Sequence, residues 1–326
     1  MKKEVIVSGI QPTGEMHIGN YLATIKDYLE LQESHQCYFF IADLHSLSED
    51  FGAQEKRRQI FEVAATLLAA GIDPDKATIF VQSHVPAHAV LFSILNSLTP
   101  IGELERMTQY KDKSLKQKTN INAALFTYPV LMAADIILYH PTYVPVGHDQ
   151  LQHLELTNTL IRKFNNRFGQ TFGEIKAFAK KPLRIMSLSN PEKKMSKSDT
   201  SSYVGIFDEP EVIKKKLSKA VTATDASSSE MPKGVANLFE LLEHFGNQSL
   251  VKKFQTEYYN NTIKYSELKS ELAEIIANYF APMREAKKKL DENPQQVTKI
   301  LQEGAKKANQ VANQTLDEVK AKIGLT

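Results

Sequence analysis

The chain has little cysteine, no long apolar run and no excess of charge of one sign. Cys37 is the only cysteine among 326 residues, which excludes an intramolecular disulfide, a Cys-rich zinc site and a protein-ligated iron–sulfur cluster. The apolar stretch Val5 to Val7 is too short for the core of a signal peptide, and no run of about 18 apolar residues could form a transmembrane helix. We therefore expect a soluble, cytoplasmic protein.

The charge balance is nearly even, with 40 Lys and Arg against 38 Asp and Glu and a net charge of +2. Contact with a nucleic acid would therefore have to come from local basic patches, because the chain as a whole does not attract polyanions. The composition, 42% hydrophobic and 24% charged, is typical of globular proteins. The length predicts about two domains.

The first half alternates short apolar runs with helical patterns. The apolar runs Glu4 to Gly9, Cys37 to Ala42 and Ala77 to Val81 predict strands, and helices are expected over Ile18 to Leu29 and Ala53 to Ala70. This alternation predicts an α/β fold with a parallel sheet covered by helices on both faces. Ligands bind at the carboxyl ends of such strands, so we expect three segments to meet there, namely 8–20, 43–46 and 82–84.

The second half is helical and rich in lysine. From about Glu209 onward, amphipathic patterns with little strand signal predict helices over 238–245, 250–258, 265–280 and 296–323. Lysine runs lie at 214–216, 252–253, 287–289 and 306–307, and each run alone is most simply a solvated helix face. The polar stretch Ser187 to Ser202 is typical of a mobile loop. We expect a sheet-based domain over 1–200 and a helical region over 201–326.

The glycines after the first strand do not form a standard phosphate loop. Gly9 and Gly14 have the spacing of a Walker loop, but Glu15 and Met16 follow where that loop needs Lys and Ser or Thr. The dinucleotide-binding pattern of three glycines is also missing. What remains is a glycine-lined turn at a helix N-terminus, where backbone N–H groups and the helix dipole favour an anion.

Two short segments, far apart in the chain, carry the strongest signal. The first is His17 to Asn20 (His-Ile-Gly-Asn), and the second is Lys194 to Ser198 (Lys-Met-Ser-Lys-Ser). Two lysines and a serine in a polar loop can fold over a triphosphate and neutralise charge as pyrophosphate leaves. Together the segments resemble the HIGH and KMSKS signatures of class I aminoacyl-tRNA synthetases.

Further segments make the resemblance more specific. They run in the order of the bacterial tryptophanyl-tRNA synthetase family, at 8–14, 17–21, 101–111, 131–136, 144–150 and 184–188. The resemblance implies a Rossmann-like catalytic domain that ends in the KMSKS loop, a helical domain for the tRNA anticodon and a homodimer. It also implies that the chain activates L-tryptophan with ATP and Mg²⁺ to an adenylate, releases pyrophosphate and transfers tryptophan to the terminal ribose of tRNA(Trp).

The resemblance also implies roles for particular residues. Those implied in catalysis are His17, Asn20, Lys194 and Lys197. Those implied in ATP binding are Gln11, Pro12, Thr13, Gly19, Asn20, Gly147, His148, Asp149, Ile185, Lys194, Met195, Ser196, Lys197 and Ser198. Those implied in tryptophan binding are His45, Tyr128, Met132, Asp135, Val146 and Gln150.

The chemistry of indole supports one of these roles independently. Indole offers a single N–H donor and no acceptor, so a selective pocket needs one buried acceptor within apolar walls. Asp135 lies in an otherwise apolar helix, where an ionised carboxylate is costly unless it is paired. From the residues alone, a structural partner such as an arginine is an equal alternative. Tyr128, Met132 and Asp135 share one helix face, although such a stripe is more often ordinary core.

Several alternatives and departures remain. A tyrosine-specific class I enzyme would need a Tyr and Asp pair that binds a phenol. A non-catalytic RNA-binding paralogue would have no need of Lys194 and Lys197 together with His17 and Asp135. A small-molecule nucleotidyltransferase would not need the helical half. Val7, Ala23 and His148 differ from common family residues. His84 and His88 have metal-ligand spacing, but Pro86 interrupts the helix that would aim both at one ion, so we expect no protein-bound metal.

Overall fold

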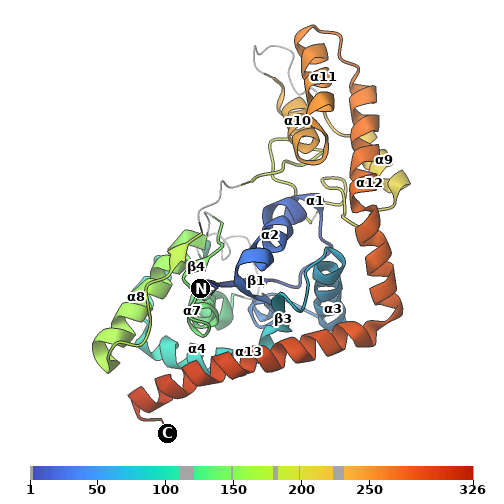
Figure 1. The fold of residues 1–326 in the computed structure, drawn as a ribbon. Coiled ribbons are helices and arrows are strands. Elements are labelled where there is room, and N and C mark those ends of the chain that lie inside the picture. The colour runs from blue at the N-terminus through green and yellow to red at the C-terminus, as the bar shows by residue number, and fades with distance from the viewer. Residues whose placement is uncertain are drawn as a thin grey trace.

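A parallel sheet lies at the centre of the molecule (Figure 1). The computed structural model describes residues 3–110, 121–147, 150–178, 183–197, 199–222 and 231–325. The described strands form a five-stranded sheet in the order β3-β2-β1-β4-β5, and each neighbouring pair is parallel. The strands are β1 (Val5–Ile10), β2 (Gln36–Ile41), β3 (Ala77–Val81), β4 (Tyr143–Val144) and β5 (Lys176–Ala177). The predicted α/β class is confirmed, and β4 and β5 are short strands that the sequence analysis did not identify.

Helices cover both faces of this sheet, as predicted. Those of the first half are α1 (Ile18–Asn20), the π-helix η1 (Tyr21–Ile25), α2 (Lys26–Ser34), η2 (His45–Ser48), α3 (Ala53–Ala69), η3 (Gln82–His84), α4 (Ala87–Leu98), α5 (Ile101–Glu105), α7 (Ala123–Ile137) and α8 (Leu151–Phe168). Those of the second half are α9 (Pro210–Ser218), α10 (Lys233–Phe245), α11 (Gln248–Tyr259), α12 (Tyr265–Glu292) and α13 (Pro294–Ile323). The helices expected in each half are therefore present.

Alternate strand residues supply two separate hydrophobic cores. Ile6, Phe39 and Ile79 pack in one core with residues of α2, α3, α10 and α12. Val7 and Phe40, their neighbours along the strands, pack in the other core with residues of α4, α7, α8 and α13. Successive side chains of a strand point to opposite faces, so strands buried on both sides read as continuous apolar runs.

The second half divides into a group of four helices, α9 to α12, and the long final helix α13. The helices α9 to α12, which we call the helical arm, pack on one another, and α12 also contacts α3. Figure 1 shows α10, α11 and the upper part of α12 extending away from the sheet, while α13 runs back beneath it. This last helix contacts β3 and α4. The division at residue 200 stays a prediction, and the final helix of the second region packs on the first.

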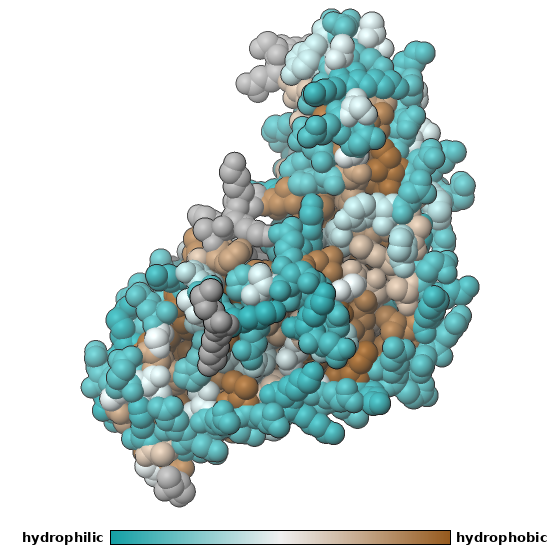
Figure 2. Space-filling view, in the orientation of Figure 1, coloured by the Kyte–Doolittle hydropathy of each residue, from teal (hydrophilic) through white to brown (hydrophobic). Residues whose placement is uncertain are grey.

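Glycine is needed where α13 crosses the sheet. A Cβ atom built on Gly304 would lie 1.8 Å from the carbonyl oxygen of Ile79, a separation that no side chain can tolerate. Only a residue without a side chain lets the helix lie directly on β3. Figure 2 shows hydrophilic residues along the outer side of this helix and over most of the face in view. Within the described ranges, no helix has the length and apolarity needed to cross a membrane.

Candidate active site

The first part of the site is the turn that follows β1. Gly14 adopts a φ of +55°, a left-handed conformation that favours glycine, and α1 begins shortly after it. His17 caps that helix: its Nδ1 accepts from the backbone N–H of Asn20 at 3.3 Å, and Asn20 Oδ1 accepts from the backbone N–H of His17 at 3.2 Å. The two residues of the HIGH-like motif therefore hold each other in place.

His17 is kept neutral by its surroundings. Burial lowers its pKa to about 4, and the positive charges of Lys197 and Lys194 act in the same direction. Because Nδ1 accepts from Asn20, the proton of the neutral ring lies on Nε2, where it can be donated to a ligand.

The Lys-Met-Ser-Lys segment lies against this turn, although about 175 residues separate the two in sequence. Lys197 Nζ donates to the carbonyl oxygen of Thr13, and Met195 is buried, with its Sδ near Gly19. The backbone N–H of Met195 donates to the carbonyl oxygen of Ile185 at 3.0 Å, which ties the loop to the preceding strand-like segment. Burial lowers the pKa of the Lys197 ammonium group. Lys194 is exposed, so the two lysines differ in their access to water.

The arm is connected directly to the HIGH-like motif. The hydroxyl oxygens of Tyr21, at the start of η1, and Tyr279, on α12, lie 2.8 Å apart in a hydrogen bond. Phe245 and Phe280 make edge-to-face contacts with this pair. Burial, followed by the hydrogen bond to Tyr279, raises the pKa of Tyr21. The residue that follows Asn20 is thus held by the arm.

The second part of the site is a buried polar cluster around Asp135 on α7. The side chain of Asp135 is only 1% exposed. Its Oδ2 lies 2.7 Å from His45 Nε2, and its Oδ1 lies 2.7 Å from both Gln82 Nε2 and His88 Nδ1. His45 follows β2, while Gln82 and His88 follow β3, so the carboxyl ends of neighbouring strands deliver all three donors.

These contacts keep Asp135 ionised. Burial raises the pKa of its carboxyl group, but the attraction of His45 and the hydrogen bonds from His45 and His88 outweigh burial and lower it to about 2. Among the described residues, the partners that the sequence left open are therefore two histidines and a glutamine, not an arginine. The result is an anionic acceptor in an apolar helix.

The other residues expected at the tryptophan pocket lie nearby to different degrees. Tyr128 packs edge-on against His45, with ring centres 6.3 Å apart, and its hydroxyl lies 2.9 Å from His153 Nε2. Met132 and Val146 are half-buried beside the second hydrophobic core. Gln150 precedes α8, and its backbone N–H donates to Gly147 at 2.9 Å. The structure thus joins Tyr128, His45 and Asp135 through contacts.

The residues expected to bind ATP also lie around the turn. Pro12 and Ile185 are buried, Thr13 is half-buried, Gln11 and Ser196 are exposed, and Gly147 is exposed just after β4. The strand β4 neighbours β1, so Gly147 and the turn lie at the same edge of the sheet. His148, Asp149 and Ser198 lie outside the described residues.

The sequence analysis placed Gln82 in one of the segments expected at the strand ends but gave it no role, and it did not assign His88 to the site. His88 was considered only as one of two zinc ligands; it is fully buried on Asp135, whereas His84 is exposed. In the part of the chain that the structure describes, no group of three or more His, Cys, Asp or Glu side chains could hold a metal ion. Gln82 directly follows the buried strand β3, which is the signal that placed it at this edge, whereas His88 lies on α4 and carries no such signal.

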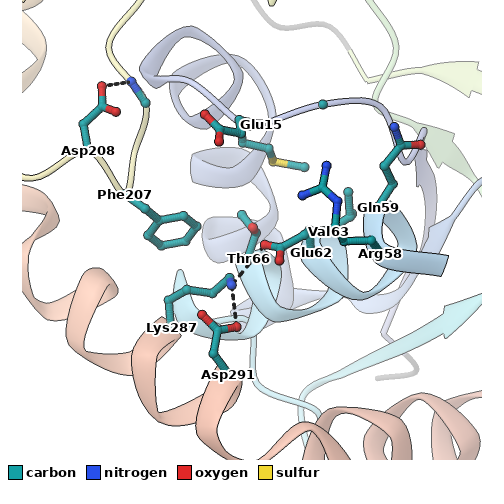
Figure 3. Close-up of a pocket in the computed structure, with 13 residues that line it drawn as sticks. Glu15, Arg58, Gln59, Glu62, Val63, Thr66, Phe207, Asp208, Lys287 and Asp291 are labelled. Atoms are coloured by element: carbon teal, nitrogen blue, oxygen red, sulfur yellow. Dashed lines mark hydrogen bonds and ion pairs between the residues drawn. The ribbon is translucent and has the colours of Figure 1, made fainter. Parts of the chain in front are cut away.

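A cavity of about 280 Å³ lies between the turn, α3 and α12 (Figure 3). At its base, Lys287 Nζ pairs with Glu62 of α3 at 3.0 Å and with Asp291 at 2.6 Å. Lys287 is buried, so the interpretation of its lysine run as a solvated face is wrong for this residue. Its ion pair with Glu62 links the arm to the sheet domain in a cavity that Gly14 also lines.

The chain is similar to known proteins over nearly its whole length. The family model for tRNA synthetases of class I (W and Y) matches residues 2–281. The chain is 44% identical over 329 residues to a tryptophan–tRNA ligase of Caldanaerobacter subterraneus, covering 98% of both chains, and 42% identical over 330 residues to that of Bacillus subtilis, covering 99% and 98%. A Campylobacter jejuni tryptophanyl-tRNA synthetase solved with ADP and tryptophan superposes with a TM-score of 0.88 at 35% identity, covering 98% of this chain and 100% of that one.

Proposed function

The chain belongs to the class I tRNA synthetases for tryptophan and tyrosine, of the bacterial tryptophanyl type, and we propose that it is a tryptophan–tRNA ligase. It activates L-tryptophan with ATP to tryptophanyl-adenylate and pyrophosphate, and then transfers tryptophan to the terminal ribose of tRNA(Trp). The observation that carries this assignment is the buried, ionised carboxylate of Asp135, because it is the one acceptor that an indole N–H requires.

The phosphate end of the site acts by position and charge. The carboxylate of tryptophan attacks the α-phosphorus of MgATP, pyrophosphate leaves, and no protein side chain acts as a nucleophile. Lys194 and Lys197 stabilise the charge that develops as pyrophosphate separates, and the neutral ring of His17 donates a hydrogen bond from its Nε2–H group to a phosphate oxygen. The backbone of Gly19 and Ile185 accommodates adenine, and Asp149 binds the ribose. Magnesium enters as part of the nucleotide.

The helical arm carries the tRNA anticodon in this proposal. Its exposed lysines Lys214, Lys215 and Lys252 have no ion-pair partner among the described residues, whereas Lys216 pairs with Asp208 and Lys253 with Glu267. Unpaired, exposed lysines are the ones free to neutralise phosphates. The bond between Tyr21 and Tyr279 connects this arm to the ATP turn.

The functional protein is a homodimer in this proposal. Large hydrophobic side chains are exposed on η2, α4 and α5, after η2 and before α7, at Leu47, Phe51, Val90, Ile101 and Ile121. The helices η2, α4 and α5 each contact α7. An exposed apolar face of this kind suits a second copy of the chain. Sedimentation of wild type and Ile101→Glu tests this, with a monomeric variant as the expected result. We also propose a cytoplasmic location.

The assay that tests the activity is amino-acid-dependent exchange of pyrophosphate into ATP, run separately with each of the twenty standard amino acids. Exchange with tryptophan alone is the expected result. Preferred exchange with tyrosine would instead support a tyrosine enzyme, and no exchange with any amino acid would support a non-catalytic RNA-binding protein. Charging of tRNA(Trp) then tests the second step.

A further inference from the structure

The two oxygens of Asp135 are bound unequally. Oδ1 accepts two hydrogen bonds, from Gln82 Nε2 and His88 Nδ1, whereas Oδ2 accepts only one, from His45 Nε2. An ionised carboxylate has about two acceptor positions on each oxygen and no proton to donate. Among the described residues, Oδ1 is therefore saturated and Oδ2 retains one open position.

Gln82 and His88, which donate to Oδ1, are each fixed by a second hydrogen bond. Gln82 is fully buried, and its Oε1 accepts from the backbone N–H of Leu44 at 3.2 Å. His88 is fully buried, and its Nε2 lies 2.9 Å from the hydroxyl of Tyr139, which stacks on Tyr38. Since the carboxylate can only accept, Nδ1 of His88 carries the hydrogen. Neither side chain can turn away without leaving a buried polar group unpaired.

We propose that Gln82 and His88, which we call the Oδ1 clamp, determine the specificity of the enzyme by positioning Asp135. The clamp occupies Oδ1 completely and prevents the carboxylate from rotating, so that the single open acceptor on Oδ2, beside His45, is the one that meets the indole N–H. This inference rests on the proposed tryptophan activity. Gln82 and His88 act through Asp135 and do not touch the substrate.

The clamp should therefore act on the N–H group and not on the rest of the ring. Without one of its donors, the carboxylate can rotate and present either oxygen, and a carboxyl group that loses hydrogen bonds to its charged form binds a proton more readily. Both changes weaken acceptance of the indole hydrogen. A substrate of the same shape without that hydrogen has nothing to lose at this position.

The test compares L-tryptophan with L-benzothienylalanine, in which a sulfur atom replaces the indole N–H. In Gln82→Leu and His88→Leu, the ratio of kcat/KM for tryptophan over the analogue in pyrophosphate exchange should fall about 10-fold, because a hydrogen bond to a charged group is weakened. His88→Asn, which retains a donor near Nδ1, should recover most of the ratio. The chain contains no tryptophan, so the fluorescence of bound tryptophan gives an independent Kd for each variant.

Gln32→Leu is the matched control. Gln32 is also a buried glutamine with two hydrogen bonds, to Gly71 and Asp73, but it lies on α2, away from Asp135. This substitution should lower stability without changing the ratio. Equal loss on both substrates in the clamp variants, with the ratio within about twofold of wild type, would overturn the inference and leave only a structural role. A wild type that fails to exchange with tryptophan would instead overturn the proposed function.

Discussion

The two ends of the site are built in opposite ways. At the Asp135 end, the carboxylate and its three partners, His45, Gln82 and His88, are buried and lie on α7 or on the short helices and α4 that follow strands β2 and β3. At the phosphate end, the groups lie on a turn and a loop, and Lys194 is exposed while Lys197 is half-buried. Discrimination between similar side chains needs a dry, fixed acceptor, whereas neutralising a departing phosphate needs charge that can move with it.

The two ends also differ in which of their buried groups is charged. Burial and its neighbours keep His17 neutral, with a pKa of about 4, while hydrogen bonds from two histidines keep Asp135 charged despite burial, with a pKa of about 2. The positive charge at the phosphate end therefore resides on lysines, and the single negative charge at the other end is compensated locally. Each difference can be tested by removing one group.

The largest effect is expected from Asp135→Ala. It leaves three buried donors without an acceptor, so stability should fall by at least about 3 kcal/mol, and kcat/KM for tryptophan should fall roughly 10- to 150-fold or more. Phenylalanine has no donor and should lose much less. The measurement is the tryptophan-to-phenylalanine ratio of kcat/KM in pyrophosphate exchange, together with thermal unfolding. A ratio that does not fall would show that Asp135 is only a structural anchor.

A similar effect on rate alone is expected from Lys197→Ala. Loss of this charge should raise the barrier to adenylate formation by about 3 kcal/mol, or roughly 10²-fold, and change tryptophan binding little. Single-turnover formation of the adenylate gives the rate, and ligand fluorescence gives the affinity. An unchanged rate would contradict the role of the loop, and a matching loss of affinity would mean that the two ends are not independent.

The pH dependence of stability should separate the two ends. The pKa of His17 is lowered from 6.5 to about 4. Its contribution to the free energy of unfolding is therefore complete above pH 6.5, and roughly 3 kcal/mol is lost as the pH falls to about 4. The pKa of Asp135 is lowered from 3.8 to about 2, so its contribution is lost only below pH 3.8. Urea unfolding of wild type and His17→Gln across this range measures the difference.

In His17→Gln, the loss of stability between about pH 6.5 and pH 4 should be smaller than in wild type. The variant lacks the histidine that binds a proton more readily in the unfolded state than in the folded state. Parallel curves for the two proteins would mean that His17 titrates normally in the folded state.

The smallest effect is expected on the arm. Replacing Lys214 and Lys215 by Gln should weaken tRNA charging and leave pyrophosphate exchange intact. The slope of log affinity for tRNA against log salt concentration should become less steep by about 0.7 to 0.9 for each phosphate that is no longer neutralised. Lys306→Gln, at an exposed lysine of α13 with no ion-pair partner among the described residues, is the matched control. If the arm variant and the control both give the wild-type salt slope, the arm lysines are ordinary solvated residues.

The local patterns were sufficient for most of the fold. Runs such as Ala77 to Val81 became β3 with the same bounds, because a strand buried on both faces needs a continuous apolar run. The short strands β4 and β5 were missed, since two residues carry too little pattern to be distinguished from a loop. The burial of Lys287 was missed as well, because its partner Glu62 lies on a distant helix.

For the site, sequence alone determined which residues carry charge and which motifs occur. The string from Lys194 to Ser198, the cap from His17 to Asn20 and the carboxylate at Asp135 are all readable without coordinates. Folding decided their partners: Lys197 on Thr13, Tyr21 on Tyr279, and Gln82 with His88 on Oδ1 of Asp135. The reason is physical. A side chain's type follows from its own codon, but its pKa and its open hydrogen-bonding positions depend on groups that only packing brings within 3 Å.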